Sequence, residues 1–170
     1  MSKNTKTLAY GALFIVLAIV TPIIFHSIGM GSVFLPMFLP ILLAGFFIEL
    51  PFVLLVGFLA PWTSALITGM PPFFPTAMVM SVECLVMTGV VSYLFYIKNR
   101  NPWICTVFAL LADRLIVVLM TFAIAPLLNL PAGFFAVTTL LYSLLGVAIN
   151  LIAVPLILNI LQKFNLINKK

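Results

Sequence analysis

Residues 64–83, SALITGMPPFFPTAMVMSVE, join two long apolar runs through a short segment that contains three prolines and two phenylalanines. Because proline lacks a backbone N–H and ends or kinks a helix, this segment predicts a turn between two helices. A carboxylate, Glu83, follows eight residues after the last proline, inside the second apolar run. A charge in such surroundings is costly and needs a partner or a cavity, so the stretch indicates the rim and floor of a small-molecule site.

The rest of the chain is as apolar as this stretch. Of 170 residues, 65% are hydrophobic and 6% are charged, and the mean hydropathy is +1.35. These values exceed those of soluble domains and predict an integral membrane protein. A chain of this length supplies about six membrane spans of roughly 20 residues each. We therefore expect one membrane domain, residues 1–170, folded as a compact all-α bundle of six transmembrane helices.

The expected spans cover about residues 5–25, 36–48, 52–69, 76–97, 103–128 and 134–164. The second is short, and Pro36 and Pro40 predict an irregular or shallow start. The first is expected to be retained, because no small-residue cleavage site follows its apolar run. The last is too long for one straight crossing and contains Gly146 and Pro155, which predicts a broken or tilted helix. Outer turns are expected near residues 26–35, 69–75 and 129–133.

The net charge of +5 comes from basic residues in both termini and in the short loop around Lys98 and Arg100. No basic patch interleaved with aromatic residues is present, so no nucleic-acid partner is expected. Under the positive-inside rule all three basic segments face the cytoplasm, and each pair of segments is separated by an even number of crossings. Six spans with both termini cytoplasmic satisfy this condition.

Three ionisable residues fall inside the expected spans: Glu83, Asp113 and Arg114. Glu83 lies about 12 Å below the outer end of its helix at the α-helical rise. One interpretation is that Arg114 pairs with either carboxylate and joins two helices. The other is that Glu83 and Arg114 contact a bound ligand. The sequence leaves both interpretations open.

Other candidate ligand contacts surround this carboxylate. Helical spacing places Met80 and Met87 on the face of Glu83, where they would form an adaptable wall. Phe73 and Phe74 are held by the proline-fixed loop and predict a rigid aromatic lid for a flat heterocycle. The alternative for the methionines is ordinary helix packing. The alternative for the single histidine is a solvated position on the surface. The remaining candidates are Met70, His26, Tyr142 and Asn150.

Residue patterns that support catalysis are missing from the sequence. The one histidine and the two cysteines, Cys84 and Cys105, have no metal-ligand spacing, and no phosphate-binding loop is present. We therefore expect no enzyme, no metal and no cofactor. Two other classes stay open: a lipid-modifying membrane enzyme that uses Glu83 with Asp113, and a small structural membrane protein.

Residues 34–95 resemble the substrate-binding S components of energy-coupling factor (ECF) vitamin transporters. The most specific run is GFLAPWTSALITGMPPFFPTAMVMSVE, residues 57–83, in which the prolines, the serine, the TGMPP loop and the glutamate follow the family's order. The resemblance implies a membrane subunit that captures a vitamin or vitamin precursor from outside. It further implies a pocket near the outer surface, built from the loops at residues 26–35 and 69–75 and from the fourth to sixth helices.

The resemblance also implies partners in the plasma membrane of a prokaryote. S components dock on one transmembrane coupling subunit and two ATPase subunits, and they do so through small residues on the first helix, where another backbone approaches closely. This chain departs from the strict spacing of alanines, so docking is expected through a looser stripe: Thr5, Ala9, Ala12 and Val16. The expected ligand is a small aromatic heterocycle such as α-ribazole, dimethylbenzimidazole, pyridoxine or hydroxymethylpyrimidine.

Overall fold

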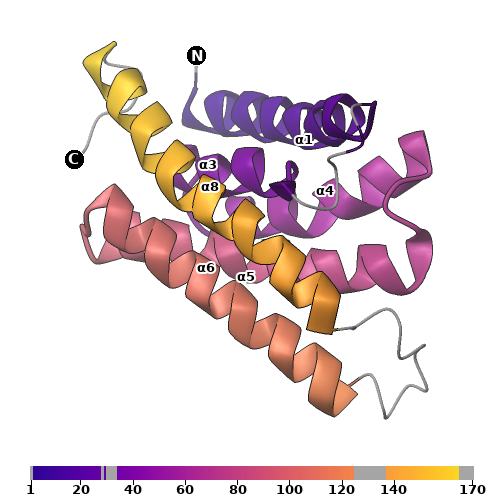
Figure 1. Ribbon diagram of the computed structural model, residues 1–170. Coiled ribbons are helices and arrows are strands. Elements are labelled where there is room, and N and C mark those ends of the chain that lie inside the picture. Colours follow the sequence, from indigo (N-terminus) through magenta and orange to yellow (C-terminus); the bar gives the residue numbers. More distant parts are fainter. Residues whose placement is uncertain (1, 28, 30–33, 125–136, 165–170) are drawn as a thin grey trace.

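The computed structural model describes residues 2–27, 29, 34–124 and 137–164, and these residues contain helices but no β-strand (Figure 1). The α-helices are α1 (Lys3–Ser27), α3 (Phe38–Phe47), α4 (Phe52–Thr68), α5 (Met78–Ser92), α6 (Pro102–Leu119) and α8 (Val137–Lys163). Three π-helical turns adjoin them: η1 (Phe73–Ala77), η2 (Tyr93–Ile97) and η3 (Met120–Ile124). All six helical segments expected from the sequence are therefore present.

Four of these segments are long and apolar enough to cross a membrane: Asn4–Ser27, Phe73–Ile97, Pro102–Phe122 and Ser143–Lys163. The other two, α3 and α4, are apolar but shorter. The architecture is that of a helical membrane bundle. The turn expected at residues 129–133 and most of the loop at residues 26–35 lie outside the described residues.

The second and the last of the expected helices differ in length from an ordinary membrane span. The second was expected to be short with an irregular start, and α3 has only 10 residues, about 15 Å at the α-helical rise, after a turn that precedes Phe38. The last was expected to be broken or tilted, and α8 is unbroken, since it continues for 27 residues through Gly146 and Pro155. At about 40 Å it is longer than a bilayer core is thick, and Figure 1 shows it running obliquely across the bundle.

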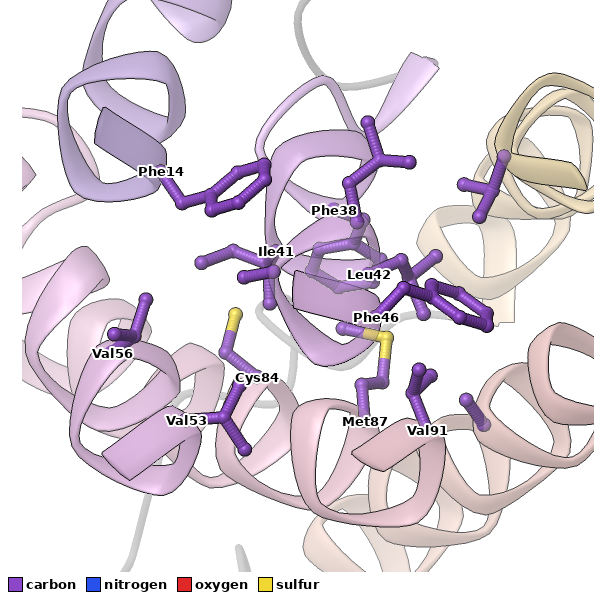
Figure 2. Close-up of a cluster of buried hydrophobic side chains, with 14 of the residues drawn as sticks. Phe14, Phe38, Ile41, Leu42, Phe46, Val53, Val56, Cys84, Met87 and Val91 are labelled. Atoms are coloured by element: carbon purple, nitrogen blue, oxygen red, sulfur yellow. The ribbon is translucent and has the colours of Figure 1, made fainter. Parts of the chain in front are cut away.

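The helix α3 forms the centre of the bundle. Its sequence, FLPILLAGFF, is apolar all round, which is typical of a helix buried on every side. It packs against α1, α4, α5 and α8. Figure 2 shows side chains of the neighbouring helices, such as Phe14 of α1, Val56 of α4 and Met87 of α5, directed toward Ile41 and Leu42 of α3. Eight of its ten residues are buried: Phe38, Pro40, Ile41, Leu42, Leu43, Ala44, Gly45 and Phe46.

A glycine brings α4 unusually close to α5. A Cβ atom at Gly57 would lie 2.6 Å from the Thr88 hydroxyl oxygen and 2.7 Å from the Cys84 carbonyl oxygen. Only a residue without a side chain permits this approach, as is common between membrane helices. Because α3 and α6 also pack against it, α5 is held firmly between its neighbours.

The two ends of the bundle differ in composition. The start of α1, the turn between η2 and α6, and the end of α8 lie at one end, on the left of Figure 1. Lys6, Lys98, Arg100 and Lys163 belong to these segments, and we call this end the basic end. The end of α1 and the turn from α4 to η1 lie at the opposite end. We call that end the proline end, because its turn carries Pro71, Pro72 and Pro75.

Candidate ligand site

A cavity of about 450 Å³ lies at the proline end, and its size is in the range of small-molecule sites. Four segments that are distant in the sequence meet around it: the end of α1, the turn before α3, the loop after α4, and the first turns of η1 and α5. Its lining residues are Pro22, His26, Leu35, Pro36, Met37, Phe38, Gly69, Met70, Pro71, Pro72, Thr76 and Met80.

The loop after α4 is fixed by hydrogen bonds to the helix that precedes it. Gly69 ends α4 with a φ of +73°, a left-handed conformation that glycine adopts without steric cost, and its N–H bonds to the Ala65 carbonyl. The Met70 carbonyl accepts hydrogen bonds from the Ser64 hydroxyl at 2.6 Å and the Thr68 hydroxyl at 3.0 Å. The Met70 N–H donates to the Thr68 hydroxyl at 3.1 Å. This wall of the cavity is therefore preformed.

The opposite wall is tied together in a similar way. The Thr21 hydroxyl of α1 donates to the Leu17 carbonyl at 2.8 Å and to the Pro36 carbonyl at 3.1 Å. The second bond joins α1 to the turn before α3, so Pro22 and Pro36 face one cavity although they are distant in sequence.

Three of the ligand contacts expected from the sequence, His26, Met70 and Met80, line this cavity together. Phe73 and Phe74 are not among its lining residues. Phe73 packs on Trp62, with ring centroids 5.6 Å apart, and the Phe74 side chain is 64% exposed. The structure therefore places the two rings beside the cavity rather than over it.

Asp113 and Arg114, adjacent residues of α6, form an ion pair within that helix. Arg114 donates from Nε at 2.9 Å and from Nη2 at 2.5 Å to one oxygen of Asp113, which is fully buried. Its third nitrogen, Nη1, donates to the Ser143 hydroxyl of α8 at 2.7 Å. One of the two pairings left open by the sequence is thus present, and the arginine also joins α6 to α8.

Glu83 lies close to this ion pair. Its side chain is 7% exposed, and it is within electrostatic range of Asp113 and Arg114. Within the part of the chain that the structure describes, no group donates a hydrogen bond to its carboxylate, and the second oxygen of Asp113 is buried without a partner. We call Glu83, Asp113, Arg114 and Ser143 the polar cluster. It contains two carboxylates and one guanidinium, so it has hydrogen-bond acceptors to spare.

The remaining expected contacts lie elsewhere. Met87 is fully buried in the core, two turns along α5 from Met80. Asn150 is 1% exposed; its amide donates to the Gly146 carbonyl at 2.8 Å, and its oxygen has no partner among the described residues. The side chain of Tyr142 lies outside the described part of the structure.

Four lining residues were missed by reasoning from the sequence: Pro22, Pro36, Met37 and Phe38. A signal that could have found them is the pair of prolines that flank the first outer loop, Pro22 within the last turns of α1 and Pro36 in the turn before α3. Ser143 of the polar cluster carried no comparable signal, because a serine inside an apolar helix normally bonds to its own backbone.

The expected docking residues share one exposed face of α1. Thr5, Ala9, Ala12 and Val16 are all exposed, whereas Phe14 and Ala18 on the other face are buried. Their spacing of four, three and four residues keeps them in one stripe along the helix. The stripe is therefore accessible to lipid or to a partner helix.

No group of three or more His, Cys, Asp or Glu side chains that could hold a metal ion occurs within the described ranges. Comparisons with protein-family models, with curated proteins and with solved structures gave no match to this chain.

Proposed function

We propose that the chain is the substrate-binding S component of an ECF-type importer for a vitamin or vitamin precursor. The observation that carries the proposal is the cavity at the proline end. It is lined from the two loops that the family resemblance implies, through His26 and Leu35 on one side and Gly69 to Pro72 on the other. A preformed, mostly apolar cavity with a few polar groups is the usual form of a small-molecule site.

We further propose that the basic end faces the cytoplasm of a prokaryotic cell and the proline end faces outward. The positive-inside rule supports this orientation, because Lys6, Lys98, Arg100 and Lys163 gather at one end. With six crossings both termini are cytoplasmic. We count α3 together with the turn before it as one of these crossings, although its 10 helical residues alone are too short to span a bilayer.

The residues of the polar cluster have two roles in this proposal, helix packing and ligand contact. Arg114 is committed to Asp113 and Ser143 and therefore stabilises the packing of α6 against α8. Glu83 has no donor among the described residues and follows Met80 of the cavity wall by one helical turn. Glu83 is thus the side chain of the cluster that is left to contact a ligand entering past Met80.

Transport itself requires partners. In the proposed cycle the ligand enters from outside and the MPPFFP loop closes over it. The loaded protein then docks through the α1 stripe on a transmembrane coupling subunit that is energised by two ATPase subunits. Exposure of Thr5, Ala9, Ala12 and Val16 supports this use of α1, since small side chains permit close helix approach.

Mass spectrometry on the protein purified alone in detergent, from cells grown in rich medium, tests the proposal. We expect a retained small heterocycle that is released on denaturation. An empty protein that also binds none of α-ribazole, dimethylbenzimidazole, pyridoxine and hydroxymethylpyrimidine would contradict the proposal and favour a structural role. Co-purification of tagged protein with an ATPase pair would then decide between the two.

A further inference from the structure

We infer that the cavity excludes anions and takes an uncharged or weakly basic nitrogen heteroaromatic, without phosphate or carboxylate. This inference rests on the proposed function and specifies its substrate class. Vitamins and their precursors occur in both free and phosphorylated forms. Exclusion of anions would mean that the protein binds the free form and not the phosphorylated one. Four features of the cavity carry it.

The first feature is the absence of cationic side chains near the cavity. In the sequence, no Lys, Arg, Asp or Glu occurs between Lys6 and Glu49 or between Glu49 and Glu83. These two stretches include every lining residue, and they also include the residues of the first outer loop. The imidazole of His26 is the one titratable side chain among the lining residues. An anionic group that entered would meet no Lys or Arg.

The second feature is the lack of backbone donors in the loop that lines one wall. Pro71 and Pro72 have no N–H. The N–H of Gly69 is bonded to the Ala65 carbonyl, and that of Met70 to the Thr68 hydroxyl. Phosphate sites in loops depend on several free N–H groups that point at the anion. This loop presents carbonyl oxygens only, and these repel an anion but accept a hydrogen bond from a ring N–H or a hydroxyl.

The third feature is the set of groups next to the cavity. One turn beyond Met80 on α5 comes Glu83, whose carboxyl group offers an anion no counter-charge but can form a hydrogen bond with a ring nitrogen or a hydroxyl. The only guanidinium inside the bundle, that of Arg114, is already bonded through three nitrogens to Asp113 and Ser143. It is therefore not available as a counter-charge without breaking the polar cluster.

The fourth feature is the apolar surface that receives the ring. Four of the twelve lining residues are prolines and three are methionines: Pro22, Pro36, Pro71, Pro72, Met37, Met70 and Met80. Thioether sulfurs make favourable contacts with aromatic rings, and the flexible methionine side chains adapt to the shape of the ring. Thr76 and His26 are also lining residues, and the hydroxyl of one and the imidazole of the other can form hydrogen bonds with the heteroatoms of a ligand.

Binding of matched pairs tests the inference. The purified protein in detergent is titrated with pyridoxine, hydroxymethylpyrimidine and α-ribazole, each beside its own phosphate ester. We expect at least one free compound to bind about a hundredfold more tightly than its phosphate, because a buried unpaired charge is strongly disfavoured. A phosphate that binds within tenfold of its free partner would overturn the inference and leave the proposed function standing. Failure of both members of every pair to bind would overturn the proposed function and the inference with it.

A charge placed in the cavity wall sharpens the test. Thr76 lines the cavity, whereas Met78, two residues further along α5, is 47% exposed and does not. We expect Thr76→Lys to reduce the preference for the free compound about tenfold or more, since it supplies the missing cation. Met78→Lys is the matched control and should leave the preference unchanged. A folded Thr76→Lys protein with the wild-type preference would show that the ligand does not occupy this cavity.

Discussion

The cavity at the proline end and the polar cluster between α5, α6 and α8 have opposite character, although neighbouring residues of α5 contribute to both. The cavity is open and apolar, and its backbone donors are already used or absent. The polar cluster is filled and charged, and its arginine is bonded to two helices. One helix serves both, since Met80 and Glu83 are one turn apart on α5. In this bundle the wall of the cavity and the bonds that hold the helices together are separated by a single helical turn.

Removing the arginine is expected to have the largest effect. Arg114→Ala leaves Asp113 buried without its counter-charge, and breaking a buried pair in this way costs about 3–5 kcal/mol of unfolding free energy. Unfolding by SDS in mixed micelles measures the change. Arg100→Ala, an exposed loop substitution, is the control and should change the stability by less than about 0.5 kcal/mol. Equal stability of both variants would show that the polar cluster does not hold the helices.

Substitution of two methionines of α5 distinguishes the contribution of the core from that of the cavity. Met87 is fully buried, and Met87→Ala should cost about 2–5 kcal/mol of stability through lost contacts and a new void. Met80 borders an existing cavity, so Met80→Ala should cost less stability but weaken ligand binding. The same unfolding assay and a binding titration measure both variants. The assignment of Met80 to the cavity and Met87 to the core would be contradicted if Met87→Ala lowers the affinity for ligand while Met80→Ala leaves it unchanged.

The role of Glu83 can be separated from that of its neighbours by an isosteric change. Glu83→Gln keeps the shape and replaces the carboxyl group by an amide, and it should lower the affinity for ligand by about tenfold, the value of one hydrogen bond. Calorimetric titration with the ligand found by mass spectrometry measures it. Unchanged affinity together with altered stability would assign Glu83 to helix packing only.

The two loop phenylalanines should have the smallest effects on stability. Phe73 packs on Trp62, so Phe73→Ala should lower the free energy of unfolding by about 0.5–1.5 kcal/mol. Phe74 is exposed, so Phe74→Ala should lower it by less than about 0.5 kcal/mol. Both are measured by SDS unfolding. Binding carries more information here. If the loop closes over the ligand, Phe74→Ala should accelerate ligand release without changing stability, and an unaltered release rate would argue against the lid.

The helices of this fold were predictable from the sequence, but the position of the cavity was predictable only in part. Apolar runs and the MPPFFP turn define all six helical segments, because a membrane permits few alternatives to the helix. The short length and irregular start of α3 were predictable from Pro36 and Pro40, because proline disfavours a regular helical start at these positions. Periodicity placed Met80 and Met87 on one face, which is correct for the helix. It could not reveal that Met87 is fully buried whereas Met80 borders the cavity, because that depends on how distant segments pack against α5.

The polar cluster shows the same limit of local patterns. The sequence identified Asp113 and Arg114 as a possible pair, and the structure contains that pair. Ser143 was not expected, because its approach to Arg114 depends on how α8 crosses α6.

The short central helix also has a consequence for how the protein enters the membrane. A segment of 10 apolar residues cannot be recognised and released into lipid as an independent span. We therefore expect α3 to be inserted together with α4, as a hairpin closed by the turn between Ile48 and Phe52. The turn that replaces a helical start before α3 supplies Leu35, Pro36 and Met37 to the lining of the cavity, so the shortness of this helix also shapes that cavity.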